Sequence, residues 1–159
     1  MSKILLVDDH EDGRDVVELF LTGAGHEVVV AGDGREAIEA AEASGFDAVI
    51  MDLCLPVLDG LSAVCRLREN DAWRGVPVVA CSAFDSGGHR RAAAAVGCDA
   101  YLVKPLNMEE LGLVLGRLLS SGRRGAQRVA SEHMGPDELL DYLDSLTAGD
   151  RAEARTYDL

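Results

Sequence analysis

The chain has 159 residues and a mass of 16.9 kDa, which suits one domain of ordinary size with a short remainder. Its formal net charge is −13, because 28 acidic side chains outnumber 15 basic ones, and this field disfavours direct nucleic-acid binding. No apolar run approaches the roughly 20 residues of a membrane-spanning helix, so membrane insertion is not expected. The acidic charge favours a divalent cation or a basic partner instead.

The cysteines indicate the environment in which the chain folds. Cys54, Cys65, Cys81 and Cys98 form no Cys-x-x-Cys pair, and no charged segment followed by an apolar run opens the chain. Unpaired cysteines of this kind are typical of a reducing compartment. We therefore expect a soluble protein of the cytoplasm.

Short apolar runs alternate with amphipathic segments over residues 1–120, which we expect to form one domain. In chain order, the pattern predicts strand 3–8, helix 12–21, strand 27–31, helix 35–43, strand 48–51, helix 60–68, strand 76–81, helix 89–96, strand 101–103 and helix 108–119. Parallel strands need crossover connections, so five β-α repeats imply a parallel sheet. The predicted fold is α/β, a doubly wound five-stranded parallel sheet, (βα)5, with helices on both faces.

The sequence changes character after the last predicted helix. Residues 121–134 are polar and rich in Gly, Arg and Ser, which is typical of a linker. Residues 135–159 form a C-terminal tail, in which 136–146 could make a short amphipathic helix with a leucine stripe. One short helix cannot form a second domain.

Charged side chains directly follow three of the predicted strands. Asp8 and Asp9 end the first run, Asp52 follows the third, and Lys104 follows the fifth. The carboxyl ends of parallel strands meet at one edge of a sheet, so these side chains are expected in one crevice. Three carboxylates repel one another unless a cation joins them, and an all-oxygen site of this kind suits Mg²⁺.

A carboxylate in such a crevice can also act as a nucleophile and form an aspartyl phosphate. Asp52 is the best-placed candidate, because Lys104 could pair with a phosphoryl oxygen and Ser82 could hydrogen-bond another. Each residue alone has an ordinary explanation, such as a helix cap for Ser82 or an exposed charge for Lys104. The combination of these residues at the ends of several predicted strands indicates a reactive site.

Four motifs lie in order at these strand ends: Val7-Asp8-Asp9, Met51-Asp52-Leu53-x-Leu55-Pro56-x-Leu58-Asp59-Gly60, Ser82-Ala83 and Asp99-Ala100-Tyr101-Leu102-x-Lys104-Pro105. Together they resemble the receiver domains of two-component response regulators, over residues 1 to about 120. The resemblance implies a flavodoxin-like fold and a signalling protein that is not an enzyme, beyond Mg²⁺-dependent autophosphorylation and slow autodephosphorylation. It also implies a cis peptide bond before Pro105.

The resemblance further implies a role for each matching residue. Asp52 would accept a phosphoryl group from a histidine kinase or a histidine phosphotransfer protein. Mg²⁺ would be held by Asp9, by Asp52 and by the backbone carbonyl of Cys54, with Asp8 acting through water. Ser82 and Lys104 would contact the phosphoryl group. Ser82 and Tyr101 would form a switch that alters the face made by the fourth helix, the fifth strand and the fifth helix, where a downstream protein target would bind.

One segment of that face departs from a regular pattern. Gly87 and Gly88 precede the predicted helix 89–96, and paired glycines there should loosen its first turn.

Three rival functions share some of these residues. Asp8-x-His10-x-x-Gly13 matches a signature of cobalamin-binding domains, in which His10 would ligate cobalt. Gly32-x-Gly34-x-x-Ala37 mimics a dinucleotide-binding loop, although Asp33 within it would oppose a pyrophosphate and is better explained as a helix cap. A phosphatase using Asp52 as its nucleophile would want a second acid where Cys54 stands.

Overall fold

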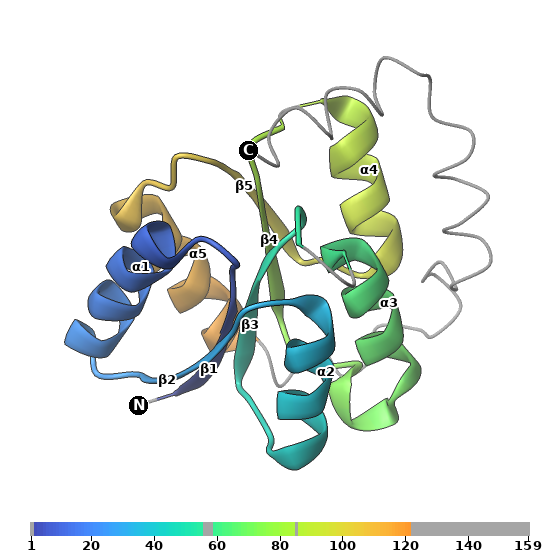
Figure 1. Cartoon of the computed structure of the whole chain (residues 1–159), viewed down its shortest axis with the longest axis horizontal. Coiled ribbons are helices and arrows are strands. Elements are labelled where there is room, and N and C mark those ends of the chain that lie inside the picture. Colours follow the sequence, from blue (N-terminus) through green and yellow to red (C-terminus); the bar gives the residue numbers. More distant parts are fainter. Residues whose placement is uncertain (1, 56–58, 85, 122–159) are drawn as a thin grey trace.

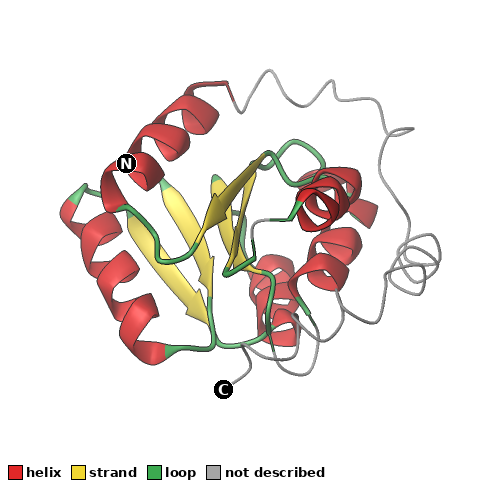
Figure 2. Ribbon diagram, turned by 90° about the horizontal axis from the view of Figure 1, so that it is seen from above, coloured by secondary structure: helices red, strands yellow, loops and turns green. Residues whose placement is uncertain are grey.

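The structure, a computed structural model, describes residues 2–55, 59–84 and 86–121. Within them a five-stranded parallel sheet lies between two layers of helices (Figures 1 and 2). The strands are β1 (Lys3–Val7), β2 (Glu27–Ala31), β3 (Ala48–Asp52), β4 (Val78–Ser82) and β5 (Ala100–Val103). The helices are α1 (Glu11–Gly23), α2 (Gly34–Ala43), α3 (Gly60–Glu69), α4 (Gly87–Val96) and α5 (Met108–Ser121), with a 3₁₀ turn, η1 (Asp71–Trp73), after α3.

The strand order β2-β1-β3-β4-β5 confirms the predicted doubly wound sheet. Strand β1 pairs in parallel with β2 on one side and with β3 on the other, where Val7 is in register with Met51. The direction in which the sheet grows therefore reverses at β1. In open α/β sheets, a reversal of this kind leaves a crevice at the carboxyl ends of the two central strands, and this crevice is the usual ligand site.

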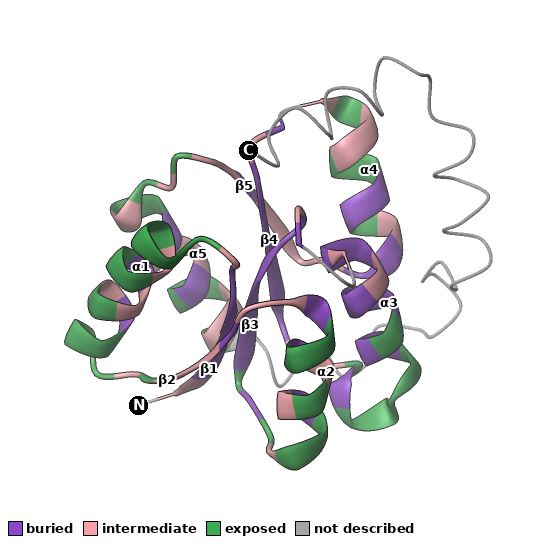
Figure 3. Cartoon of the chain, in the orientation of Figure 1, coloured by how far each residue is buried: buried purple, intermediate pink, exposed green. Residues whose placement is uncertain are grey.

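Both faces of the sheet are covered, which explains why the central strands are almost continuously apolar. On one face, Leu5 and Met51 pack against α2, α3 and α4. On the other face, Leu6 and Ile50 pack against α1 and α5 (Figures 1 and 3). Successive residues of one strand therefore belong to different cores, as the two-residue period of a strand requires.

A buried arginine ties the amino edge of the sheet together. The Arg68 guanidinium at the end of α3 donates hydrogen bonds to the carbonyls of Trp73, Val76 and Gly97, and it lies 3.2 Å from the carboxylate of Asp99. Asp99 in turn accepts a hydrogen bond of 2.9 Å from the amide of Val78, which starts β4. A charge this deeply buried is tolerated because carbonyls and a carboxylate surround it.

Most predicted elements differ from the structure by one or two residues at an end, and two of these differences have a local cause. The fourth strand begins at Val78 and not at residue 76, because η1 continues into a turn in which the Val76 amide bonds the Trp73 carbonyl at 3.3 Å. Helix α4 begins at Gly87, so the paired glycines lie inside its first turn and do not precede it. The Ser86 side chain caps this turn by accepting a hydrogen bond from the His89 amide, which offsets the low helix propensity of glycine.

The predicted tail is not part of this description. The predicted linker 121–134 lies outside the described residues except for Ser121, which ends α5, and the tail 135–159 with its possible helix 136–146 lies outside them altogether. Among the described helices, none is long and apolar enough to cross a membrane.

Candidate functional site

Four strands place polar side chains at the carboxyl edge of the sheet. Asp52 is the last residue of β3 and Ser82 the last of β4, while Asp8 directly follows β1 and Lys104 directly follows β5. Asp8, Asp52 and Ser82 are buried, and the Lys104 side chain is 25% exposed. Each strand runs through the core and ends at this edge, so strand packing and register bring these residues to one edge.

One ammonium group joins two of the carboxylates. Lys104 Nζ lies 2.9 Å from Asp52 Oδ2 and 3.2 Å from Asp8 Oδ2. The other oxygen of each carboxylate accepts a backbone hydrogen bond, Asp52 Oδ1 from the Cys54 amide at 3.0 Å and Asp8 Oδ1 from the His10 amide at 2.9 Å. Both acids are therefore held in fixed orientations by the turns that follow their strands.

Asp9 differs from its two neighbours in a way that bears on metal binding. Its Oδ1 atom is buried and accepts no hydrogen bond from the described residues. Ligand atoms of Asp8, Asp9, His10 and Asp52 all lie within 4.8 Å of one another, which is close enough for one ion to contact them. A buried oxygen without a donor is costly unless a cation or water satisfies it, so the residues present fit a divalent cation.

The electrostatics of the site are dominated by burial. Burial raises the pKa of the Asp52 carboxyl to about 6, although Lys104 and the Cys54 amide act in the opposite direction and Asp8 adds to the increase. Burial also opposes the charge on Lys104, but the attraction of Asp52 and then of Asp8 outweighs it and raises the pKa of the ammonium group. The folded protein therefore stabilises the cation and destabilises the Asp52 carboxylate until further positive charge is supplied.

This imbalance predicts a pH-dependent stability in the absence of divalent ions. Because the pKa of Asp52 rises from 3.8 to about 6 on folding, the folded state binds the proton more tightly, and stability is lost as pH rises through that interval. Asp52→Asn removes the titration. Urea unfolding in a chelator should show the variant more stable than the parent by about 1–3 kcal/mol at pH 7–8, with the difference vanishing near pH 4. A parent protein that is as stable as Asp52→Asn at pH 7–8, or more stable, would contradict this prediction.

The two predicted switch residues lie beside this cluster and contact its neighbours. Ser82 Oγ accepts a hydrogen bond of 3.1 Å from the Phe84 amide, and the Ser82 carbonyl accepts one of 2.7 Å from the Lys104 amide. The Tyr101 hydroxyl donates to the Phe84 carbonyl at 2.7 Å, and the Arg90 guanidinium lies 4.9 Å from the centre of the Tyr101 ring. Phe84 therefore links both switch residues to the start of α4.

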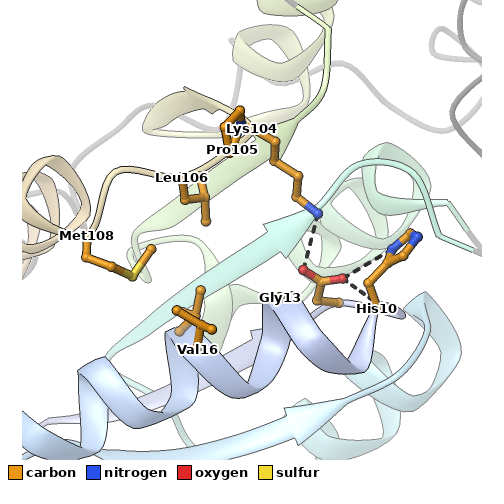
Figure 4. Close-up of a pocket in the computed structure, with 9 residues that line it drawn as sticks. His10, Gly13, Val16, Lys104, Pro105, Leu106 and Met108 are labelled. Atoms are coloured by element: carbon orange, nitrogen blue, oxygen red, sulfur yellow. Dashed lines mark hydrogen bonds and ion pairs between the residues drawn. The ribbon is translucent and has the colours of Figure 1, made fainter.

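A cavity of about 390 Å³ opens beside the carboxylates, between α1 and the segment that leads into α5. Its apolar wall includes Val16, Leu106 and Met108, and its polar end is formed by Asp8, His10 and Lys104 (Figure 4). Figure 4 shows the Lys104 and His10 side chains meeting at the polar end. The peptide bond between Lys104 and Pro105 is cis, as the resemblance implied, and it lies at the rim of this cavity.

Two residues of the site were not assigned to it from the sequence. Arg14 on α1 donates to the carbonyl of Asp8, six residues earlier in the chain, at 3.2 Å. The other residue is Gly60, which follows Asp59 in the second motif. Asp59 does cap α3 by accepting a hydrogen bond of 2.9 Å from the Ser62 amide, but Gly60 also lies directly against the Asp52 backbone.

Comparison with known proteins agrees with this geometry. The response regulator receiver domain family matches residues 4–115. The transcriptional regulatory protein PrrA of Mycobacterium tuberculosis is 39% identical over 140 residues, which are 86% of this chain and 58% of PrrA. The response regulator MprA of Mycolicibacterium vanbaalenii is 34% identical over 154 residues, which are 94% of this chain and 64% of MprA. The chain thus spans about three-fifths of the length of these relatives.

Solved structures give the same result. The chemotaxis protein CheY4 of Vibrio cholerae has a TM-score of 0.71 and 37% identity, and the match covers 74% of this chain and 98% of CheY4. The receiver domain of the sensor histidine kinase PA1611 of Pseudomonas aeruginosa, solved with a magnesium ion coordinated in its active-site cleft, has a TM-score of 0.71 and 38% identity. That match covers 76% of this chain and 98% of the other.

The chain belongs to the response regulator receiver domain family, a class of signalling proteins that are generally not enzymes. The predicted fold and family are confirmed. Neither the cobalamin alternative nor the dinucleotide alternative gains support. His10 lies against the acid pair, and the Asp33 side chain caps α2 by accepting a hydrogen bond of 2.8 Å from the Glu36 amide, where a pyrophosphate would need to bind.

Proposed function

We propose that this chain is the phosphoacceptor of a two-component phosphorelay and that Asp52 takes the phosphoryl group from a phosphohistidine. The observation that carries the proposal is the Asp52 carboxylate, buried at the carboxyl edge with the Lys104 ammonium 2.9 Å away. A buried carboxylate with a raised pKa is poorly solvated, which favours reaction with an electrophile that brings its own counter-charge.

The chemical step transfers one phosphoryl group between two side chains. A carboxylate oxygen of Asp52 forms a bond to phosphorus while the bond between phosphorus and the donor's imidazole nitrogen breaks. The imidazole leaves with that electron pair and is neutral once its other nitrogen carries a proton. Lys104 is positioned to pair with a phosphoryl oxygen, and the Ser82 hydroxyl, at the end of the adjacent strand, is the candidate donor to another.

Asp9, Asp52 and the Cys54 carbonyl are the proposed direct ligands of Mg²⁺, and Asp8 acts through water. One feature supports a direct bond from Asp9: among the described residues its Oδ1 has no hydrogen-bond donor, whereas both oxygens of Asp8 and of Asp52 already accept hydrogen bonds. When bound, Mg²⁺ supplies positive charge that stabilises the transferring phosphoryl group. Lys104 alone supplies too little positive charge, because a phosphoryl group adds about −1.5 to −2 charges to an acidic cluster.

A direct test uses a small acyl-phosphate donor in place of the kinase. Incubation with Mg²⁺ and the donor should increase the intact mass by one phosphoryl group, and peptide mapping should place the group on the segment that contains Asp52. Omission of Mg²⁺ in the presence of a chelator should reduce the incorporation rate by at least about 100-fold, because the phosphoryl charge is then uncompensated. Equal incorporation in the chelator would disprove the role of the ion.

The α4-β5-α5 face is the proposed site of output to a downstream protein. Its support is the chain of contacts from the Ser82 hydroxyl through Phe84 to the Tyr101 hydroxyl, since Phe84 also stacks on His89 of α4 with ring centres 4.8 Å apart. Movement of Ser82 toward a phosphoryl group would release the Phe84 amide and disturb both contacts. Hydrogen exchange of α4 and β5 amides in the phosphorylated sample should change, and unchanged exchange would argue against this face.

The partners follow from the family and from the names of the relatives. Receiver domains interact with histidine kinases, and we propose a kinase or a histidine phosphotransfer protein as the phosphodonor. Relatives such as PrrA are transcriptional regulatory proteins, so a DNA-binding effector is a candidate target. The net charge of −13 makes direct DNA contact by this chain unfavourable. Four free cysteines are consistent with a reducing, cytoplasmic location.

A further inference from the structure

His10 is the one residue of the acidic cluster to which the proposed function gives no role. It is the N-cap residue of α1, but its side chain makes no capping hydrogen bond. The imidazole instead turns toward the carboxylates, with Nδ1 2.9 Å from Asp9 Oδ1 and 3.7 Å from Asp8 Oδ1 (Figure 4). Its side chain is 57% exposed, so burial does not force this orientation.

The close approach of His10 to Asp9 is not a hydrogen bond. The buried Asp9 Oδ1 accepts none from the described residues, although the imidazole nitrogen is within hydrogen-bonding distance. The in-plane direction of Nδ1 therefore does not point at this oxygen, and in the tautomer with a bare Nδ1 two electron-pair donors lie side by side. Such a pair is stabilised when both atoms face a common cation.

The spacing of these atoms fits one octahedral ion. With ligands at about 2.1 Å, adjacent ligand atoms are roughly 3.0 Å apart and opposite ones roughly 4.2 Å apart. The 2.9 Å between His10 Nδ1 and Asp9 Oδ1 corresponds to adjacent ligands, whereas Asp8 Oδ1, which is proposed to act through water, lies 3.7 Å from the same nitrogen. The ligand atoms of all four side chains in the cluster lie within 4.8 Å of one another, about 0.6 Å beyond the spacing of opposite ligands, so small side-chain movements would close the shell around an ion.

We infer that His10 is a nitrogen ligand of this cation site and shifts its selectivity from Mg²⁺ toward first-row transition ions such as Co²⁺ and Ni²⁺. The inference rests on the proposed function, because it uses the same ion site. Mg²⁺ prefers oxygen ligands and keeps several waters, whereas imidazole nitrogen binds the later transition ions strongly. Loss of His10 therefore removes much of the affinity for Co²⁺ and little of the affinity for Mg²⁺.

The test compares the affinities of the full chain for the two ions. Co²⁺ is titrated and followed by its visible absorption, and Mg²⁺ is measured by competition, in the parent, in His10→Ala and in His26→Ala. His26 is the matched control, because it lies before β2 and its Nδ1 accepts a hydrogen bond from the Ser2 amide at 3.3 Å. In His10→Ala the Co²⁺ affinity should fall by about tenfold or more, while the Mg²⁺ affinity changes by less than about threefold. His26→Ala should match the parent for both ions.

A second readout identifies the ligand directly. The exchangeable ring proton of a histidine bound to Co²⁺ has a large paramagnetic shift in proton NMR, and this signal should be present in the parent and absent in His10→Ala. If His10→Ala weakens Co²⁺ and Mg²⁺ binding equally, the imidazole orients Asp9 without binding metal, and the inference is wrong. It is also wrong if His10→Ala leaves Co²⁺ binding unchanged.

Asp9→Ala separates this inference from the proposed function. If Asp9→Ala abolishes binding of both ions and His10→Ala affects neither, the metal site stands and only the role of His10 is refuted. If Asp9→Ala leaves both ions bound as in the parent, the ion lies elsewhere, and the metal site and the role of His10 are refuted together.

Discussion

Asp52→Asn is expected to abolish phosphoryl incorporation from a small acyl-phosphate donor in Mg²⁺, with at least about a thousandfold loss of rate. The amide oxygen of Asn can still accept the hydrogen bond that the Cys54 amide gives to Asp52 Oδ1. The substitution therefore removes the nucleophilic carboxylate while it keeps the shape of the site. Intact-mass measurement over time gives the rate.

Asp47→Asn is the matched control for this substitution. Asp47 precedes β3 at the opposite end of the strand that ends in Asp52, where it accepts a hydrogen bond of 2.8 Å from the Lys3 amide. This variant should incorporate phosphate at the parental rate. Incorporation in Asp52→Asn at a rate within tenfold of the parent would show that another residue is the main acceptor. Because Asp52→Asn is expected to be the more stable protein at neutral pH without metal, unfolding is not the expected cause of a loss.

Gly60→Ala is expected to lower the free energy of unfolding by about 3 kcal/mol or more. A Cβ atom at residue 60 would lie 2.2 Å from the Asp52 carbonyl oxygen and 2.7 Å from Leu53 Cα. Both are backbone atoms of the turn that orients the Asp52 carboxylate, and neither can rotate away as a side chain would. The turn must therefore move, and the phosphorylation rate should fall by at least about tenfold as the carboxylate loses its position.

Gly116→Ala tests whether the loss at Gly60 is specific. Gly116 lies inside α5 and has no atom within 4 Å of the site where a Cβ would be added. Alanine there should stabilise the protein by about 0.5–1 kcal/mol, because glycine is a poor helix former. Urea unfolding measures both variants. A Gly60→Ala protein as stable as the parent, with a normal phosphorylation rate, would show that the contact between α3 and β3 is looser than described.

The sequence predicted the architecture well because the apolar runs, the helical segments and their order in the chain all indicated the same fold. Apolar runs such as residues 48–51 could only be strands covered on both faces, and helical segments between them required parallel connections. The errors occurred at the ends of elements, because local hydrogen bonds determine the residue at which a helix or strand begins. Gly87 belongs to α4 because the Ser86 side chain caps the turn, which a count of glycines does not reveal.

The candidate site was predictable for a similar reason. Asp8, Asp9, Asp52 and Lys104 each lie at or just after the carboxyl end of a strand, and strand direction brings them to one edge. The sequence could not show which oxygens remain without donors. Within the part of the chain that the structure describes, Asp9 Oδ1 has no donor while Asp8 and Asp52 are held by Lys104 and backbone amides, and this difference arises from turn geometry.

Sequence by itself therefore determined the fold class, the family and the identity of the charged residues at the strand ends, because periodicity and chain order constrain these strongly. Only the tertiary structure decided the balance of forces within the site. Burial raises the pKa of Asp52 against the pull of Lys104, and His10 turns toward Asp9. Gly60 leaves no space beside the Asp52 backbone. These properties depend on distances between segments far apart in the chain, which the order of residues does not specify.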